Sequence, residues 1–246
     1  MTAARRRVLL VIAVLLAAGA AVALALSRPS SPSLPPRPAG EKPTLLLLTS
    51  LPLMFGEDFS IDGGGSPALS AVEKRYRIVP ISVSSPAELA KGRLLLMAHP
   101  LAQPAEELVA LDRWVRGGGR VLLLADPLLE WPSKRPLGDR LRPPPMFMDT
   151  GLLAHWGLRL DAPDERGPRT GKLGDYEVLT ASPGTLHGKC AVGEDGLAAH
   201  CSIGKGKATV VADADFLGVQ HLDGPTAHNL DALLAELDRL DSEPSP

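Results

Sequence analysis

Four short apolar runs, each bounded by turn-forming residues, constrain the fold of this chain more than any other feature of its sequence. They are residues 44–49 (TLLLLT), 93–98 (RLLLMA), 120–125 (RVLLLA) and 207–212 (KATVVA). A continuous apolar run of this length is typical of a strand that is buried on both faces. Helical patterns at 68–75 and 104–116, and a further strand pattern at 76–83, stand between the runs. Alternating strands and helices imply crossover connections, so the sequence predicts an α/β domain with a mainly parallel sheet.

The second half of the chain has a different pattern. Residues 128–150 are rich in proline, and a short helix is expected at 151–156. Short alternating segments near 176–179, 186–192 and 197–203 then indicate a small antiparallel hairpin insertion in the sheet. An amphipathic helix over 226–240 closes the domain, with leucines along one side.

The two cysteines stand on either side of an expected hairpin turn. Asp195-Gly196 is a favoured two-residue turn, and a hairpin centred there pairs Cys190 directly with Cys201. Directly opposed residues lie about 4.5–5.5 Å apart by Cα, within the range that a disulfide spans. Alternation places Cys190, Val192, Leu197, Ala199, Cys201 and Ile203 on one face. The sequence therefore predicts a Cys190–Cys201 disulfide, and the alternative is two separate buried thiols.

The N-terminal segment indicates where the protein is located. Three arginines, Arg5 to Arg7, precede nineteen uncharged, largely apolar residues at 8–26. Such a helix, at about 1.5 Å per residue, spans the hydrocarbon core of a bilayer, and basic residues stay on the cytoplasmic side. The sequence predicts a single-pass anchor in the bacterial inner membrane, N-terminus inside, with the domain in the periplasm. The alternative is a signal peptide cleaved after the small residues at 23–25.

The domain boundaries follow from composition. Residues 28–43 contain six prolines in sixteen residues, so we expect an extended linker there. The expected organisation is an anchor or signal peptide at 1–27, this linker, a single α/β domain at 44–240 and a tail at 241–246.

Charge and composition exclude several classes of protein. The chain has 26 basic and 28 acidic residues, without the basic excess of a nucleic-acid-binding protein. Its 45% apolar and 22% charged side chains also exclude wholesale disorder.

Polar residues follow the expected strands at the edge where parallel sheets bind ligands. We therefore treat Ser50 (beside Thr49), His99, Asp126, Asp213 and Asp215 as candidate ligand-binding residues. A histidine with nearby acids can act as a general base or bind a metal. The same residue types commonly cap helices or accept hydrogen bonds from loop amides, and we favour that structural role.

The motifs that specify a reaction are missing. The sequence has no phosphate-loop GK[ST] and no G-x-S-x-G elbow, and the glycine pattern at 63–68 lies too far beyond its strand to cradle a dinucleotide. Its six histidines show no HxxxH or HxH spacing. We therefore assign no catalytic residue, no metal and no cofactor.

Three segments carry a resemblance to a known group: residues 93–129, 204–217 (GKGKATVVADADFL) and 228–240, where Asn229 opens the helix. Together they resemble the auxiliary domain of uncharacterised gliding-motility-type ABC transport systems and related membrane-anchored domains of unknown function. The resemblance implies a fold like that of class I glutamine amidotransferases or flavodoxins. This chain lacks the amidotransferase cysteine after its third strand, so no catalytic residue is carried over.

The resemblance implies a membrane-anchored periplasmic accessory or binding domain, non-catalytic, whose partners are the inner membrane and the permease or ATPase subunits of an ABC-type transport or envelope system. The alternative is a periplasmic hydrolase or small-ligand-binding protein that uses His99, Asp126 and Asp213.

Overall fold

The computed structural model describes residues 34–56 and 65–242. The predicted anchor or signal peptide, the first part of the linker and the last four residues lie outside the described residues. Within the described ranges, no helix has the length and apolar character needed to cross a membrane.

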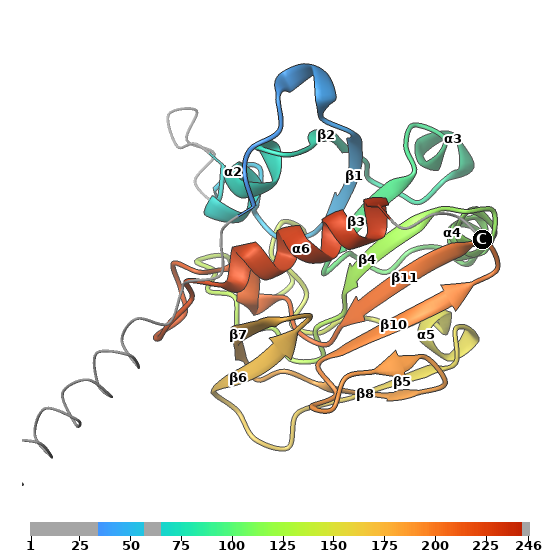
Figure 1. Ribbon diagram of the computed structural model, residues 1–246. Coiled ribbons are helices and arrows are strands. Elements are labelled where there is room, and N and C mark those ends of the chain that lie inside the picture. The colour runs from blue at the N-terminus through green and yellow to red at the C-terminus, as the bar shows by residue number, and fades with distance from the viewer. Residues whose placement is uncertain (1–33, 57–64, 243–246) are drawn as a thin grey trace, which may run out of the picture. The chain divides into compact units, whose positions relative to one another are not determined.

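A seven-stranded mixed sheet forms the centre of the domain (Figure 1). Its strands are β1 (Thr44–Thr49), β2 (Arg77–Pro80), β3 (Leu94–Ala98), β4 (Arg120–Leu124), β9 (Ala191–Val192), β10 (Ala198–Ile203) and β11 (Gly206–Val211). The strand order is β2-β1-β3-β4-β11-β10-β9. The first five strands in this order pair in parallel, and β10 runs antiparallel to both its neighbours. The prediction of a mainly parallel α/β sheet is therefore confirmed.

Helices cover both faces of this sheet because the apolar strands alternate their side chains between two cores. The helices are α2 (Pro67–Glu73), α3 (Pro86–Leu89), α4 (Ala105–Arg116), α5 (Leu152–His155) and α6 (Asn229–Ser242). Helices α2 and α6 pack on one face, against Leu45 and Leu47 of β1. Helices α3, α4 and α5 pack on the other face, against Leu46 and Leu48.

Two small antiparallel sheets lie beside the central one. One pairs β5 (Leu158–Asp161) with β8 (Thr185–Gly188), and the other pairs β6 (Pro168–Leu173) with β7 (Tyr176–Ala181). Sequence patterning predicted β7 and β8 but not β5, β6 or α3. Strand β6 is largely exposed, so it lacks the apolar alternation by which a strand is recognised.

The predicted cysteine hairpin is present. Strand β10 pairs with β9 in the expected register, and a Cys190–Cys201 disulfide joins them with a Cα–Cα distance of 4.8 Å. The turn differs from the prediction: the amide of Gly193 donates to the carbonyl of Ala198 at 2.8 Å, so the loop is longer than Asp195-Gly196. This longer loop turns Leu197 to the opposite core from Cys201.

The last part of the predicted linker, residues 34–43, contacts the α/β domain. The amide of Arg37 donates to the carbonyl of Lys74 at 3.0 Å, and its guanidinium binds Asp238 at 3.0 Å and lies over the ring of Tyr76. Leu34 also contacts the core. Side chains between the prolines therefore pack against α6 and the segment that follows α2.

Candidate site at the carboxyl edge of the sheet

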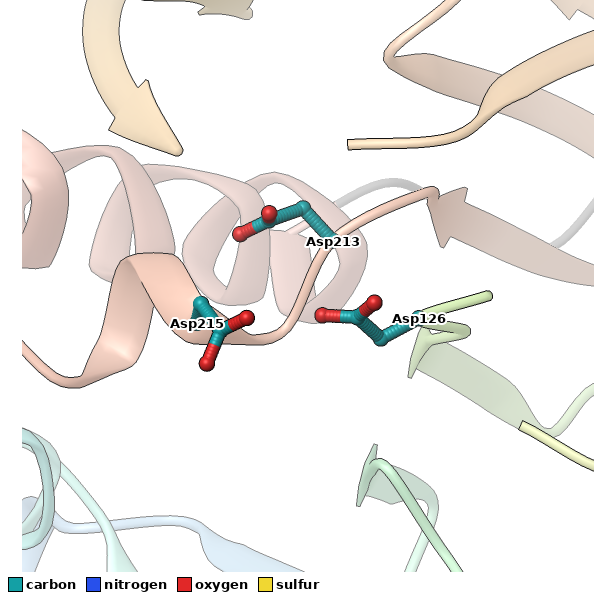
Figure 2. A group of neighbouring side chains, drawn as sticks. All are labelled: Asp126, Asp213 and Asp215. Atoms are coloured by element: carbon teal, nitrogen blue, oxygen red, sulfur yellow. The ribbon is translucent and has the colours of Figure 1, made fainter. Parts of the chain in front are cut away.

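Parallel strands bring three predicted site residues to one edge. His99, Asp126 and Asp213 follow β3, β4 and β11, which are neighbours in the sheet. Asp126 and Asp213, together with Asp215, form a cluster in which one carboxylate oxygen from each lies within 4.8 Å of the others (Figure 2). All three aspartates are buried, at 0%, 0% and 4% exposure. The segments that follow β4 and β11 therefore bring these three acids together.

Backbone amides occupy most of the carboxylate oxygens of this cluster. Asp126 accepts hydrogen bonds from the amides of Leu128 at 2.9 Å and Ala214 at 2.8 Å. The oxygens of Asp213 accept from the amides of Ala181 at 3.1 Å and Phe216 at 2.8 Å. Each of these two side chains therefore closes a turn in its own loop and also connects that loop to a second segment of the chain.

Asp215 connects the cluster to the proline-rich segment. Its Oδ2 accepts from the amide of Glu130 at 2.7 Å. The carboxylate of Glu130 in turn accepts from the hydroxyl of Ser182 at 2.9 Å. The acidic cluster thus joins the loops after β4, β7 and β11.

Burial and mutual repulsion favour the neutral forms of these acids. Loss of hydration raises the pKa of Asp126 to about 6, with the charge of Glu130 adding to the rise. Burial, and then the charges of Asp126 and Glu130, raise the pKa of Asp215 to about 8. Burial and the two neighbouring carboxylates hold the pKa of Asp213 well above its usual range. Three acids in a low-dielectric site cannot all ionise cheaply, so the cluster retains protons near neutral pH.

His99 lies outside the acidic cluster. Its Nε2 is 2.9 Å from the carbonyl oxygen of Pro144, and burial lowers its pKa to about 4. Its Nδ1 is buried without a hydrogen-bond partner among the described residues. The residue also adopts a left-handed backbone conformation, with φ of 46°, which is uncommon for residues other than glycine, although histidine takes it more often than most.

The side chains of Ser50 and Thr49 connect the carboxyl ends of the neighbouring strands β1 and β3. The hydroxyl of Ser50 donates to the carbonyl of His99, and that of Thr49 donates to the carbonyl of Ala98 at 2.8 Å. In sheets of this topology, the ends of these two strands flank the crevice where ligands bind. Here hydroxyl-to-carbonyl hydrogen bonds join the two strand ends.

The arrangement has a limited chemical repertoire. Three carboxylates at these separations could hold a divalent cation, which prefers oxygen ligands. Five of their six oxygens already accept a hydrogen bond from a backbone N–H. These N–H dipoles stabilise the carboxylates in the absence of a cation. Within the described ranges, the hydrogen-bond partners of the His99 imidazole and of the three carboxylates are backbone groups, with no hydroxyl or thiol nucleophile among them.

Three further residues complete the site: Asn229, Glu130 and Ser182. Asn229, at the start of α6, is fully buried; its amide nitrogen donates to the carbonyls of Leu179 at 2.8 Å and Phe216 at 2.9 Å. The resemblance singled out this asparagine, but no sequence signal pointed to Glu130. Ser182 was also missed, and it shares a left-handed conformation, φ 52°, with His99.

The larger cavities lie away from the acids. A cavity of about 500 Å³ is bordered by Trp131, Lys134 and His221, and another of about 220 Å³ by Ser50, Phe55 and Leu141. A third, of about 590 Å³, lies between the β6–β7 hairpin and the turn near Asp195. Ser50 is therefore the one predicted site residue that borders any of these three cavities.

Comparison with known proteins gives a fold but no family. No family model matches the chain, and no curated protein matches its sequence. The chain is similar to the solved structure of the mmIFT52 N-terminal domain at 14% identity and a TM-score of 0.51, over 81% of this chain and 98% of that one.

Two other solved structures show weaker similarity. One is a cytoplasmic protein from Salmonella typhimurium LT2, at 11% identity and TM-score 0.49 over 80% of this chain and 99% of that one. The other is the exo-β-1,4-mannosidase Op5Man5 from Opitutaceae bacterium strain TAV5, at 14% identity and TM-score 0.48 over 81% of this chain. This chain spans 36% of the mannosidase's length. The mmIFT52 similarity, at 14% identity, bears on the fold alone and says nothing about activity.

Proposed function

We propose that this protein is a membrane-anchored periplasmic accessory or binding domain, non-catalytic, that works with the permease and ATPase subunits of an ABC-type transport or envelope system. On this proposal residues 1–27 form a single-pass inner-membrane anchor. The domain belongs with the auxiliary domains of gliding-motility-type transport systems that its sequence resembles, and its fold is of the flavodoxin or glutamine amidotransferase type.

The observation that carries this proposal is that the polar residues of the shared segments form hydrogen bonds to the backbone. Asp126, Asp213, Asp215 and Asn229 stand at the most distinctive positions of the shared segments. Their side chains bond to backbone groups of strand β7 and of the loops after β4 and β11. A motif whose polar groups hold loops together supports a fold signature and not an active site, and it leaves function to the surfaces that the loops present.

The disulfide supports export. Disulfides persist in oxidising compartments such as the periplasm and are rare in the bacterial cytosol. The Cys190–Cys201 pair is fixed by strand register, so its formation needs only an oxidising environment. The parallel order β2-β1-β3-β4-β11 supports the finer fold assignment, because it is the order of flavodoxin-like sheets with β11 as the fifth strand.

Capture of partners tests the proposal. We expect the tagged full chain, cross-linked in its native membranes before solubilisation, to co-purify with a permease and its ATPase. A matched sample that expresses the same tag on residues 1–43 alone controls for recovery through the anchor. Equal recovery from both samples, or recovery of no transport subunit, would contradict the proposed role. A reporter fused after Pro246 tests topology separately, since periplasmic activity requires export of the domain.

The hydrolase or ligand-binding alternative has one observation in its favour. His99 is buried in a strained conformation with Nδ1 unpartnered among the described residues, and such strain often gathers at functional sites. Its separation from the acidic cluster and from the three cavities argues against this alternative.

A further inference from the structure

Exposed apolar side chains concentrate on the loops at the carboxyl edge of the sheet. Eight large apolar side chains of the described residues are exposed, and six of them follow β1, β3 or β4. These six are Phe55, Leu101, Leu137, Leu141, Met146 and Met148. Leu137 is the most exposed, at 80%, and Phe55 and Leu141 border the same 220 Å³ cavity as Arg135.

Basic residues are interspersed among the apolar ones. Residues 131–142, which we call the basic loop, carry Lys134, Arg135, Arg140 and Arg142 against the single acid Asp139. The loop therefore has a formal charge of +3 in a chain whose net charge is −2. Lys134 and Arg140 are exposed to solvent.

Hydrogen bonds give the basic loop a defined shape. The amide of Leu141 donates to the side chain of Asp139 at 2.8 Å, and the guanidinium of Arg142 donates to the carbonyl of Arg135. Downstream, the amide of Phe147 donates to the carbonyl of Asp126 at 2.6 Å and holds the segment against the end of β4. Leu137 is thus presented to solvent by a turn that is closed on itself and fixed to the sheet.

We propose that the basic loop, together with Phe55, docks the domain onto the surface of an anionic phospholipid bilayer. Apolar side chains enter the boundary between headgroups and acyl chains, while lysine and arginine neutralise lipid phosphates. A protruding leucine among cations suits a fluid headgroup layer, which needs no matching pocket. The inference rests on the proposed function in one respect: the anchor brings the domain within reach of a bilayer.

Docking is tested on the full chain with a fluorescent label whose emission depends on polarity. Leu137→Cys provides the labelling site, because Cys190 and Cys201 are already bonded to each other. The labelled protein is reconstituted in nanodiscs of phosphatidylcholine, with or without phosphatidylglycerol. We expect blue-shifted, brighter emission only in the anionic discs.

Matched variants separate docking from mere proximity to lipid. A label at Lys74→Cys, an exposed position at the opposite edge of the sheet, should show the same emission in both discs. The double change Lys134→Glu and Arg140→Glu should abolish the shift at position 137. Glu57, Asp58 and Asp62 follow Phe55 in the sequence, outside the described residues. Added salt would screen these acidic side chains as well as the basic ones, so the charge-reversed variant is the more direct test of the basic side chains.

Three results would overturn docking: equal emission at position 137 in neutral and anionic discs, an unchanged shift in the charge-reversed variant, or a lipid-free shift that grows with protein concentration. The last would mean that a second copy of the chain covers the loop. The docking result does not depend on the proposed anchor or on partner capture. If residues 1–27 are cleaved or do not insert, the labelled protein can be mixed with preformed nanodiscs, and the same emission is measured.

Discussion

The acidic cluster contributes stability that depends on pH, and acidification should increase this contribution. The fold raises the pKa of Asp126 to about 6 and that of Asp215 to about 8, from ordinary values near 3.8. A raised carboxyl pKa means that the folded state favours the neutral acid. The resulting stability is fully present below about pH 4 and is lost as pH rises through the folded-state pKa. The acids should therefore lose stability between about pH 4 and pH 8, whereas the buried His99, whose pKa is lowered to about 4, adds stability as pH rises from about 4 to 6.5. Comparison of variants at each pH isolates the effect of the acids.

The magnitude follows from the pKa values. For Asp126, the rise to about 6 corresponds to roughly 3 kcal/mol of unfolding free energy, lost between about pH 4 and pH 6. Asp215 extends the loss to about pH 8. Its one recorded acceptor atom, Oδ2, binds the amide of Glu130, and the oxygen of asparagine can take that place. We therefore expect Asp215→Asn to stabilise the protein by about 2 kcal/mol or more at pH 8 and to have little effect at pH 4.

Asp213→Asn provides the contrast. Both of its oxygens accept backbone amides, so an asparagine NH₂ must face an N–H in either orientation. This variant should lose stability at both pH values, by about 1–3 kcal/mol for the unsatisfied groups. The assay is urea unfolding in mild detergent, followed by the fluorescence of the buried Trp131 and Trp156, with the exposed Asp223→Asn as control. An Asp215→Asn variant that is destabilised at pH 8, or one whose gain in stability is the same at pH 4 and pH 8, would refute the reasoning.

Four shorter predictions accompany this one. Replacing both Cys190 and Cys201 with serine should cost about 3 kcal/mol by loop-closure entropy for a separation of 11 residues, and free thiols in oxidised protein would contradict the bridge. Asn229→Ala should cost about 3 kcal/mol or more because it unpairs buried groups of Leu179 and Phe216, and Asn229→Asp should also be destabilising because it turns a carboxylate oxygen toward both carbonyls, as urea unfolding would measure. His99→Ala should support function in a complementation assay at matched protein levels, and loss of function with unchanged thermal stability would favour the hydrolase alternative. Mg²⁺ and EDTA should leave the Tm at pH 8 equal, while a rise with Mg²⁺ would identify the acidic cluster as a cation site.

The sequence predicted those parts of the fold that burial determines. A strand covered on both faces must be apolar throughout, so β1, β3, β4 and β11 are visible as uninterrupted runs. The cysteine register was predictable because side chains in a hairpin alternate with a fixed period. The exposed β6 and the four-residue α3 bury too little apolar surface to leave such a pattern.

The candidate site was predictable in composition but not in its contacts. Parallel topology places Asp126 and Asp213 at one edge of the sheet. Their contact depends on the pairing of β4 with β11, and the sequence of neither strand indicates which strand lies next to it. The partners of the carboxylates are backbone amides, which every residue carries, so no side-chain pattern indicates them. The packing of residues 34–43, whose prolines suggested an unattached linker, was hidden for another reason: the side-chain partners of Arg37, which are Tyr76 and Asp238, lie far away in the sequence.

The pairing of β4 with β11 also bears on how the protein reaches its folded state. About eighty residues separate the two strands along the chain, yet β11 completes the parallel part of the sheet and α6 covers one of its faces. Contacts this distant in sequence form late, because a long loop must close before they add stability. Until β11 and α6 arrive, the edge of β4 and the apolar face beneath α6 are open to pairing with other chains. A chain delivered from its N-terminus would carry this vulnerability until its last forty residues had arrived, so truncations there should favour aggregation over partial folding.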